Sequence, residues 1–245
     1  MLISVKIVQL ESLVYRQNLT SMKFIKRSID IVVSTSIIIM IIPILIVVYI
    51  LIFILEGRPI LYNSPRYISS KKKVTIYKFR TMVKDPTLPE FKLNSYLVDG
   101  FYQIPLESKV YTNIGRFLEK TQIVELLQLV NVLCGQMSLV GNRPLPQKNH
   151  EDIAKFQNWE QRYLCPCGIT GISQIVGKDI LKASERIKLE SMYALCYEKQ
   201  KFSLILIDFY ILYRTFIFVF FKINLSYSKA KKLLEKCLKL HLVLF

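Results

Sequence analysis

The chain has 245 residues, 52% of them hydrophobic, with a mean hydropathy of +0.33. These values exclude disordered, collagen-like and coiled-coil chains. Lys and Arg number 34 against 18 for Asp and Glu, and the net charge of +16 predicts a polyanionic partner, such as nucleic acid, nucleotide phosphates or anionic lipid. The five cysteines match neither a disulfide scaffold nor a zinc site, because only two histidines are available. We therefore expect reduced thiols.

A membrane segment is the first predicted element. Residues 31–55 carry no charge, and roughly 25 such residues exceed the ~20 that span a hydrocarbon core. The segment is too long and starts too late for a signal peptide. Basic residues flank both of its ends, and both flanks therefore favour the cytosolic side. Because Pro43 lies near its midpoint, where it can kink a helix, we expect a re-entrant helix-break-helix hairpin. The alternative is a single kinked transmembrane helix.

The middle of the chain favours short strands and one buried helix. Residues 60–62 and 74–79 are rich in β-branched and aromatic side chains, which is typical of strands. Three prolines and a glycine between residues 83 and 109 predict a loop with short helical pieces. From Gly115 to about Gly135 apolar residues recur at helical spacing and predict a helix with one buried face.

The remaining elements are predicted to be mostly helical. Residues 139–144 favour a turn, and residues 168–171 favour a loop framed by glycines. We expect helices over 149–163 and 180–197, a helix over 202–221 that lies on or partly inserts into a membrane, and an interfacial amphipathic helix over 229–240.

Four basic residues are candidates for binding phosphate groups. Lys78 and Arg80 flank a Phe soon after the membrane segment, and guanidinium groups such as those of Arg116 and Arg143 can grip a phosphate with two parallel hydrogen bonds. The alternative for each is a solvated or lipid-facing charge. Arg143 fits that alternative least well, because Asn142 and Pro144 place it in a rigid turn.

Acidic groups are scarce, and two of them are candidates for chemistry. Asp85 follows the basic run closely, and Glu125 lies at the edge of a polar stripe on the predicted helix. Val124 is an apolar residue within that stripe. Glu125 could hold Mg²⁺, which commonly takes one or two carboxylates plus substrate phosphates. The alternative is a surface Glu paired with Lys120 or Lys92.

Several strings, taken together and in order from about residue 23 to 215, resemble the bacterial sugar transferase family, the monotopic polyprenyl-phosphate phosphoglycosyl transferases. The matching strings are Lys26-Arg27-Ser28-Ile29-Asp30, Pro43, Gly57-Arg58-Pro59-Ile60, Arg66, Lys78-Phe79-Arg80-Thr81-Met82, Ile114-Gly115-Arg116-Phe117-Leu118, residues 125–133, Met137-Ser138-Leu139-Val140-Gly141 with Arg143-Pro144, and Gly168-Ile169-Thr170-Gly171 with Gln174.

The resemblance implies a cytosol-facing membrane enzyme that uses Mg²⁺ to move a sugar phosphate from a nucleotide diphosphate sugar to a polyprenyl phosphate. It further implies an Asp-Glu pair, in which the Asp attacks the β-phosphate, UMP leaves, and the lipid phosphate displaces the phosphosugar. The Glu of that pair is Glu125, and the Asp position is Val124. An isopropyl group cannot form an acyl phosphate, so this route cannot run through residue 124. Gln136 and Asn142 likewise replace a usual Asp and a usual Pro.

We therefore predict an α+β, mostly helical fold with a re-entrant membrane hairpin and a small cytosolic head. The expected parts are an N-terminal extension (1–22), the membrane hairpin (23–56), a cytosolic phosphoglycosyl-transferase-like domain (57–225) and a basic amphipathic tail (226–245).

Two functions stay open at this point. One is a transferase in which Glu125 or Asp85 replaces the missing Asp, or in which the lipid phosphate attacks the donor directly. The other is an impaired member that binds lipid phosphate or nucleotide sugar, or that scaffolds a glycan-assembly partner. The expected partners are polyprenyl phosphate, a nucleotide sugar and membrane lipid, with a homo-oligomer left open and no nucleic acid, since no nucleic-acid motif occurs. The composition is typical of AT-rich genomes and fits a low-GC bacterium or an organelle with a bacterial-type genome. With the resemblance and the basic flanks, we expect the protein on the cytosolic face of a bacterial inner membrane or of a bacterial-type organelle membrane.

Overall fold

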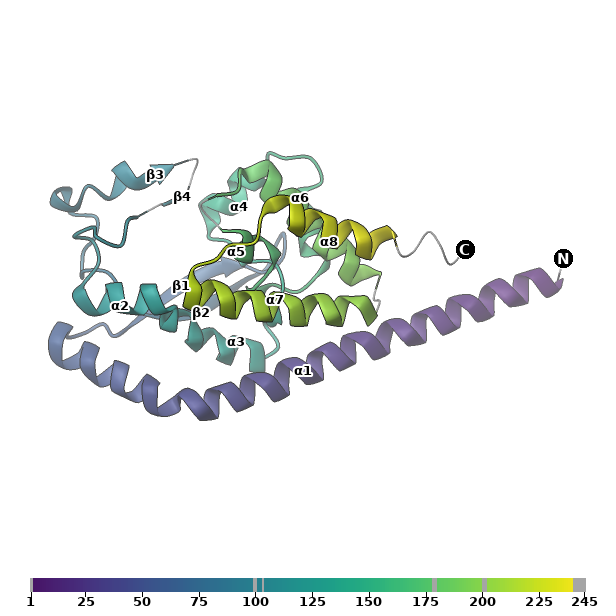
Figure 1. Cartoon of the computed structure of the whole chain (residues 1–245), viewed down its shortest axis with the longest axis horizontal. Helices are drawn as coiled ribbons and strands as arrows, with labels where there is room; N and C mark the ends of the chain where they lie inside the picture. The colour runs from purple at the N-terminus through teal and green to yellow at the C-terminus, as the bar shows by residue number, and fades with distance from the viewer. Residues whose placement is uncertain (1, 99–100, 103, 178–179, 200–201, 240–245) are drawn as a thin grey trace.

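The computed structural model describes residues 2–98, 101–102, 104–177, 180–199 and 202–239. Most of them are helical, and the described strands form three two-stranded sheets. The predicted α+β, mostly helical class is confirmed. A long N-terminal helix extends beside a head that contains all the other elements (Figure 1).

The first helix, α1 (Leu2–Glu56), contains the predicted membrane segment and passes through Pro43 without interruption. Figure 1 shows that α1 changes direction in its second half. A proline removes one backbone hydrogen bond and displaces the preceding turn, which bends a helix when neighbouring hydrogen bonds survive. The expected helix break is therefore replaced by a bent, continuous helix. The part from Met22 to Glu56 and the later helix over Ser203–Phe221 are both long and apolar enough to cross a membrane.

The start of the apolar segment is fixed to the head by two cations. Lys26 donates to the carbonyl oxygen of Val140 at 3.1 Å and forms an ion pair with Asp208. Arg27 donates to the carbonyl oxygens of Val132 (2.6 Å) and Leu133 (2.8 Å). The two carbonyl groups bound by Arg27 lie in the last turn of a short helix over Leu129–Leu133, where backbone carbonyl groups can accept from side chains.

The far end of the segment is fixed to the same head. Arg80 donates to the carbonyl oxygens of Glu56 at 2.9 Å and Gly57 at 3.3 Å, at the last turn of α1. A straight helix of about 25 residues would separate its ends by roughly 37 Å. Both ends of the segment nevertheless contact the same head. A continuous helix can do this because it is bent.

The two predicted strands form an antiparallel ribbon of β1 (Leu61–Tyr67) and β2 (Lys73–Phe79). Tyr62 pairs with Lys78, and Arg66 pairs with Val74. Because side chains alternate across a strand, Arg66 and Lys78 lie on one face of this ribbon. The loop that follows holds the predicted short pieces: η1 (Pro89–Phe91), η2 (Leu93–Tyr96), β3 (Leu97–Val98) and β4 (Phe101–Tyr102).

The single helix predicted from Gly115 to Gly135 is wrong. It is divided into α2 (Asn113–Thr121), the 3-10 helix η3 (Ile123–Gln128) and α3 (Leu129–Leu133). The division falls at Gln122, whose φ of 60° is left-handed and ends an α-helix. Apolar spacings of three and four residues fit an α-helix but also a short 3-10 turn, which the pattern alone cannot separate.

The predicted turn and the glycine-framed loop form a small parallel sheet. β5 (Ser138–Val140) pairs with β6 (Gly168–Thr170). A Cβ atom at Gly141 would lie 2.2 Å from the carbonyl oxygen of Pro166, so the close approach of the two segments requires glycine there.

Helices build the rest of the head. The predicted helix over 149–163 is two elements, α4 (Gln147–Ile153) and η4 (Trp159–Leu164), separated at Asn158, which has a left-handed φ of 59°. The elements that follow are α5 (Ile172–Val176), α6 (Ala183–Glu198), α7 (Phe202–Phe221) and α8 (Tyr227–Lys239). The predicted helices over 180–197 and 202–221 are confirmed by α6 and α7.

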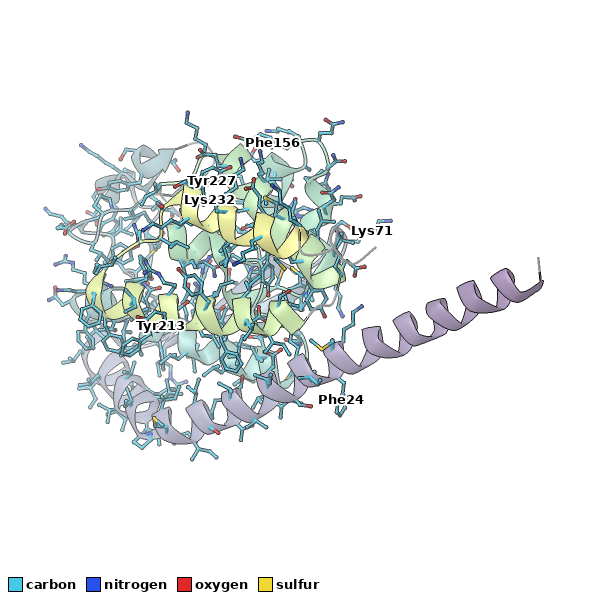
Figure 2. The ribbon with its side chains drawn as sticks, turned by 45° about the vertical axis from the view of Figure 1, so that its right-hand side comes forward. Phe24, Lys71, Phe156, Tyr213, Tyr227 and Lys232 are labelled. Atoms are coloured by element: carbon cyan, nitrogen blue, oxygen red, sulfur yellow. The ribbon has the colours of Figure 1, made fainter. Side chains whose placement is uncertain are left out.

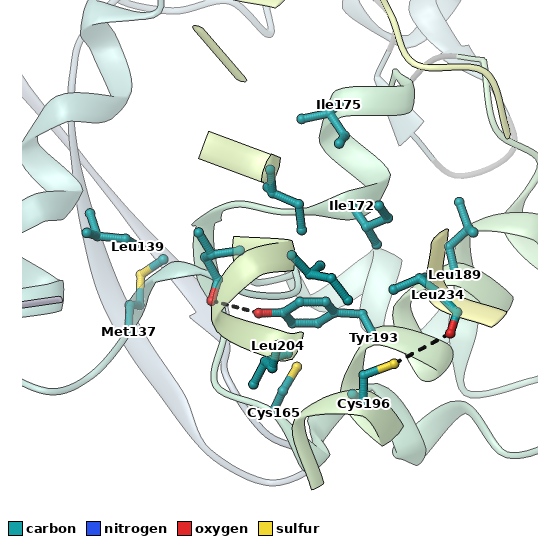
Figure 3. Close-up of a cluster of buried hydrophobic side chains, with 14 of the residues drawn as sticks. Met137, Leu139, Cys165, Ile172, Ile175, Leu189, Tyr193, Cys196, Leu204 and Leu234 are labelled. Atoms are coloured by element: carbon teal, nitrogen blue, oxygen red, sulfur yellow. Dashed lines mark hydrogen bonds between the residues drawn. The ribbon is translucent and has the colours of Figure 1, made fainter. Parts of the chain in front are cut away.

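Tyr193 of α6 lies fully buried at the centre of the largest apolar cluster. Its hydroxyl group lies 3.4 Å from the Val140 carbonyl oxygen. Figure 3 shows the Tyr193 ring among other side chains of this cluster. The same cluster includes Leu234 and Cys237 of α8. The predicted helix near the C-terminus exists, but much of its apolar side packs on the head and is not free to lie on a lipid surface.

One side of the head exposes aromatic residues next to α1. Tyr213 of α7 and Phe24 of α1 lie on this side, whereas Tyr227 and Lys232 of α8 lie beyond α7 (Figure 2). Phe209 and Phe216 of α7 are also exposed. Exposed aromatic rings beside an apolar helix are typical of a membrane-facing surface.

Candidate active site

Glu125 of η3 is the centre of the candidate site. Its carboxylate accepts two hydrogen bonds from Arg143, at 2.6 and 3.2 Å, and one from Lys78 of β2 at 3.3 Å. The Glu125 side chain is 14% exposed. Three residues predicted from the sequence are therefore brought together from segments that are far apart along the chain. The alternative of a surface Glu125 paired with Lys120 or Lys92 is wrong.

The two cations keep Glu125 ionised. Burial alone would raise the pKa of Glu125, but the positive charges of Arg143 and Lys78, with their hydrogen bonds, hold it well below its ordinary value. Burial also lowers the pKa of Lys78, although the charge of Glu125 opposes this effect. At neutral pH Glu125 therefore serves as a fixed negative charge and has no proton to donate.

Arg66 is a third cation that the sequence reasoning did not assign to the site. Burial, followed by the charge of Arg143, lowers the pKa of Arg66 to about 10, and the charge of Glu125 opposes that shift. Its Nε atom donates to Ser64 at 2.8 Å. Alternation along β1 is the signal that could have identified Arg66, because it shares a ribbon face with Lys78. We call Arg66, Lys78, Arg143 and Glu125 the cation cluster.

Arg143 is fixed through its backbone. Arg162 donates from Nη2 to the Arg143 carbonyl oxygen at 2.8 Å. Asn142 donates from Nδ2 to the carbonyl oxygens of Arg162 at 2.7 Å and of Glu190 at 2.9 Å. Asn142 stands where the resembling family usually has Pro, and its side-chain amide now fixes the turn by hydrogen bonds.

A buried ion network supports this turn. Arg162 is 0% exposed and pairs with Glu190 at 2.8 Å, and Arg186 pairs with the same carboxylate at 3.0 Å. Ser173 donates a further hydrogen bond to Glu190 at 2.8 Å. Burial would raise the pKa of Glu190, but the charges of Arg162 and Arg186 lower it to about 2. The sequence analysis did not identify these residues, because Arg162 and Ser173 are distant from Glu190 along the chain and the i,i+4 pair of Arg186 and Glu190 has the spacing of an ordinary surface pair on a helix.

Arg80 and Arg116 lie on neighbouring segments, but no hydrogen bond joins either to Glu125 among the described residues. Arg80 holds the end of α1, and its Nε and Nη1 atoms have no hydrogen-bond partner in the described part of the chain. Gly115 packs so closely on Thr81 that a Cβ atom there would lie 1.8 Å from its carbonyl oxygen. Phosphate binding by Arg80 and Arg116 stays a prediction.

Asp85 is placed in a local turn. Its carboxylate accepts from the hydroxyl group of Thr87 at 2.6 Å and from the Thr87 backbone N–H at 3.2 Å. Such a contact two residues ahead is typical of a loop turn. No contact between Asp85 and Glu125 occurs among the described residues, and a chemical role for Asp85 stays a prediction.

Val124 lies in an apolar cluster. It is 2% exposed and packs in a group with Val48 and Ile52 of α1, Phe79 of β2 and Leu118 of α2. The side chain at this position therefore contributes to packing between the head and α1, whereas the next residue of η3, Glu125, faces the cations Lys78 and Arg143.

The donors around Glu125 do not fit Mg²⁺. A magnesium ion prefers oxygen ligands and usually takes one or two carboxylates. Both Glu125 oxygens already accept from Arg143, and the described residues contain no group of three His, Cys, Asp or Glu side chains that could hold a metal. Gln136 supplies an amide oxygen, which accepts from Asn131 at 2.6 Å. The metal role of Glu125 stays a prediction, and no step below is routed through a metal.

The chain matches known proteins along most of its length. The family model described as bacterial sugar transferase matches residues 21–222. The undecaprenyl-phosphate galactose phosphotransferase of Salmonella typhimurium is 32% identical over 179 residues, which cover 71% of this chain and 37% of that protein. The UDP-glucose:undecaprenyl-phosphate glucose-1-phosphate transferase of Klebsiella pneumoniae is 34% identical over 174 residues, which cover 69% of this chain and 35% of that protein.

A third relative is matched over more of its own length. The exopolysaccharide production protein PSS of Rhizobium leguminosarum is 31% identical over 159 residues, which cover 62% of this chain and 74% of that protein. The chain spans only about a third of the length of the first two relatives. The family match includes the apolar part of α1, the cation cluster and the buried ion network, and the chain belongs to the bacterial sugar transferase family.

Proposed function

We propose that this protein transfers a sugar phosphate from a UDP-sugar to a polyprenyl phosphate such as undecaprenyl phosphate, and so initiates the synthesis of a polysaccharide or glycoconjugate. The observation that carries this proposal is the cation cluster, in which the partly buried cations Lys78 and Arg143 pair with Glu125 and Arg66 lies on the same ribbon face as Lys78. Buried cations with too few counter-charges favour an anionic ligand. Phosphates are the anions named or implied by the relatives' activities.

The position of the head relative to the membrane follows from α1. Both ends of its apolar segment contact the head, through Lys26 and Arg27 at one end and Arg80 at the other. Both flanks are basic, which favours the cytosolic side for each. These features support a re-entrant helix with the head on the cytosolic face, where nucleotide sugars are made.

The chemistry proposed here is a direct displacement. An oxygen of the lipid phosphate attacks the β-phosphorus of the UDP-sugar, and a new P–O bond forms. The bond from that phosphorus to the oxygen bridging the two donor phosphates breaks, and UMP leaves with the electron pair. Arg66, Lys78 and Arg143 would stabilise negative charge on the phosphoryl oxygens, since positioning and charge neutralisation supply much of phosphoryl-transfer catalysis.

Arg143→Gln is expected to abolish most of the transfer while the protein stays folded. The change removes a bidentate contact to phosphate, and we expect a loss of about 100-fold or more in rate. The measurement is transfer of radiolabel from a panel of UDP-sugars to undecaprenyl phosphate by the detergent-solubilised protein. Lys155→Gln is the matched control, because Lys155 is an exposed cation paired with Asp152 at 2.7 Å. If the unaltered protein transfers no label from any donor, the proposed activity is wrong.

A second function is favoured by one observation. Val124 is buried in an apolar cluster at the position where the family is expected to have its nucleophile. A protein without that nucleophile could bind lipid phosphate or nucleotide sugar, or scaffold a glycan-assembly partner, without catalysing transfer. Binding of a UDP-sugar by an unaltered protein that forms no lipid-linked product distinguishes this function from the transferase.

A further inference from the structure

The side chains around Glu125 already supply positive charge of the kind that neutralises a bound phosphate group. Lys78 and Arg143 pair with Glu125, Arg66 lies on the same ribbon face as Lys78, and the charge of Glu119 also acts on Lys78. Three positive charges therefore stand against two carboxylates, and the site carries an excess of positive charge before any ligand binds. Adding a divalent cation there would place two more positive charges against three existing ones. Coulomb repulsion between partly buried like charges opposes that step.

We infer that the cation cluster binds the phosphate groups of its substrates without a divalent cation, with Arg66, Lys78 and Arg143 supplying the positive charge that Mg²⁺ would otherwise supply. The inference rests on the proposed function, because it concerns the same site. The ligand chemistry is a phosphate or diphosphate group, from either the nucleotide sugar or the lipid phosphate.

Glu125 acts in this site as an internal competitor of the ligand. Its two oxygens accept from both guanidinium Nη atoms of Arg143, at 3.2 and 2.6 Å. These parallel donors are also the ones that best fit two phosphate oxygens. An incoming phosphate must therefore share or replace the contacts between Glu125 and Arg143, and the charge of Glu125 weakens its binding.

Because of this competition, the direction in which Glu125→Gln changes phosphate affinity distinguishes the two roles of Glu125. If Glu125 held a magnesium ion that bridges the phosphates, removing its charge would weaken phosphate binding. If Glu125 instead competes with phosphate for Arg143 and Lys78, removing its charge strengthens binding. Gln keeps nearly the same size and can still accept a hydrogen bond from Lys78, so the variant tests charge more than packing.

The experiment measures binding of inorganic pyrophosphate to the detergent-solubilised full chain by calorimetry, in EDTA and in Mg²⁺. We expect the unaltered protein to bind in EDTA, and Glu125→Gln to bind about three- to tenfold more tightly. Arg143→Gln and Arg66→Gln should each weaken binding by about tenfold, as expected for loss of a charge-assisted contact. Asp152→Asn removes an exposed carboxylate from the ion pair with Lys155 and is the matched control for Glu125→Gln.

Two results would overturn the inference. One is binding that requires Mg²⁺ in the unaltered protein. The other is weaker binding by Glu125→Gln with an unchanged melting temperature. Should Arg143→Gln not fold, Arg66→Gln and Lys78→Gln test the same cations. A second set of measurements with farnesyl phosphate distinguishes the lipid phosphate from the nucleotide diphosphate as the ligand. The ligand whose affinity falls more in Arg143→Gln is the one that the cation cluster recognises. Binding needs no turnover, so this test can fail or succeed separately from the transfer assay.

Discussion

Glu190→Gln is expected to lower the free energy of unfolding by about 3–5 kcal/mol at pH 7, because the change leaves two buried cations without their counter-charge. Arg162 is fully buried, and both Arg162 and Arg186 pair with Glu190. The measurement is thermal or denaturant unfolding of the detergent-solubilised protein. Glu235→Gln is the matched control, because Glu235 pairs with Lys231 on the surface of α8 at the same i,i+4 spacing as Arg186 and Glu190. We expect that control to cost less than about 1 kcal/mol.

The effect of Glu190→Gln depends on pH in a fixed direction. The folded protein lowers the pKa of Glu190 from 4.5 to about 2, so its charge stabilises the fold above the ordinary value and ceases to do so as the pH falls toward 2. The difference in free energy of unfolding between the unaltered protein and Glu190→Gln should therefore be largest above about pH 4.5 and become smaller below it. A difference that grows on acidification would contradict the ionised network.

Val124→Asp is expected to destabilise the protein by about 3 kcal/mol or more without increasing transfer, because it places a carboxylate among apolar side chains. Val124 is 2% exposed and packs with Ile52, Phe79 and Leu118. A buried carboxyl group in such a cluster takes up a proton in preference to staying ionised, and a protonated acid is a poor nucleophile. The measurements are unfolding and label transfer for the same preparation.

Val124→Asn separates the effect of charge from that of polarity. Asn has the shape of Asp without its charge, so it should cost less stability, and the difference between the two variants should narrow at low pH. A Val124→Asp protein that is as stable as the original and transfers sugar phosphate faster would contradict this prediction and show that residue 124 reaches the reacting phosphates. If the original transfers none, the same result would favour the binding or scaffolding function over the transferase.

Parts of the fold with strong local patterns could be predicted from the sequence. The apolar segment of α1 is a long uncharged run, and β2 has alternating side chains that face the core. β1 is predicted only over 60–62, because Pro65 reads as a break, whereas the strand continues to Tyr67. The β5–β6 pair could not be predicted, because three residues in each strand are too few to show alternation and the partners are distant in sequence. The division at Gln122 depends on one left-handed residue, for which the apolar spacing has no signal.

The candidate site was predicted in its residue types more than in its contacts. Glu125, Arg143 and Lys78 are all candidates from the sequence, but only the fold shows that Lys78 and Arg143 both bind Glu125. Arg80 was selected for phosphate, whereas its hydrogen bonds go to the end of α1, because a sequence does not reveal which carbonyl groups need a partner. Arg66 was missed since its role depends on the register between β1 and β2.

The order of bond making is the central claim of the transferase proposal, and exchange of radiolabelled UMP into a UDP-sugar tests it most directly. The protein is incubated with radiolabelled UMP and an unlabelled UDP-sugar, in the presence and in the absence of undecaprenyl phosphate. Because Val124 cannot accept a phosphosugar, direct displacement predicts lipid-linked product when the lipid phosphate is present and no label in the UDP-sugar when it is absent. Exchange without the lipid would reveal a covalent phosphosugar intermediate on another residue and would contradict the account.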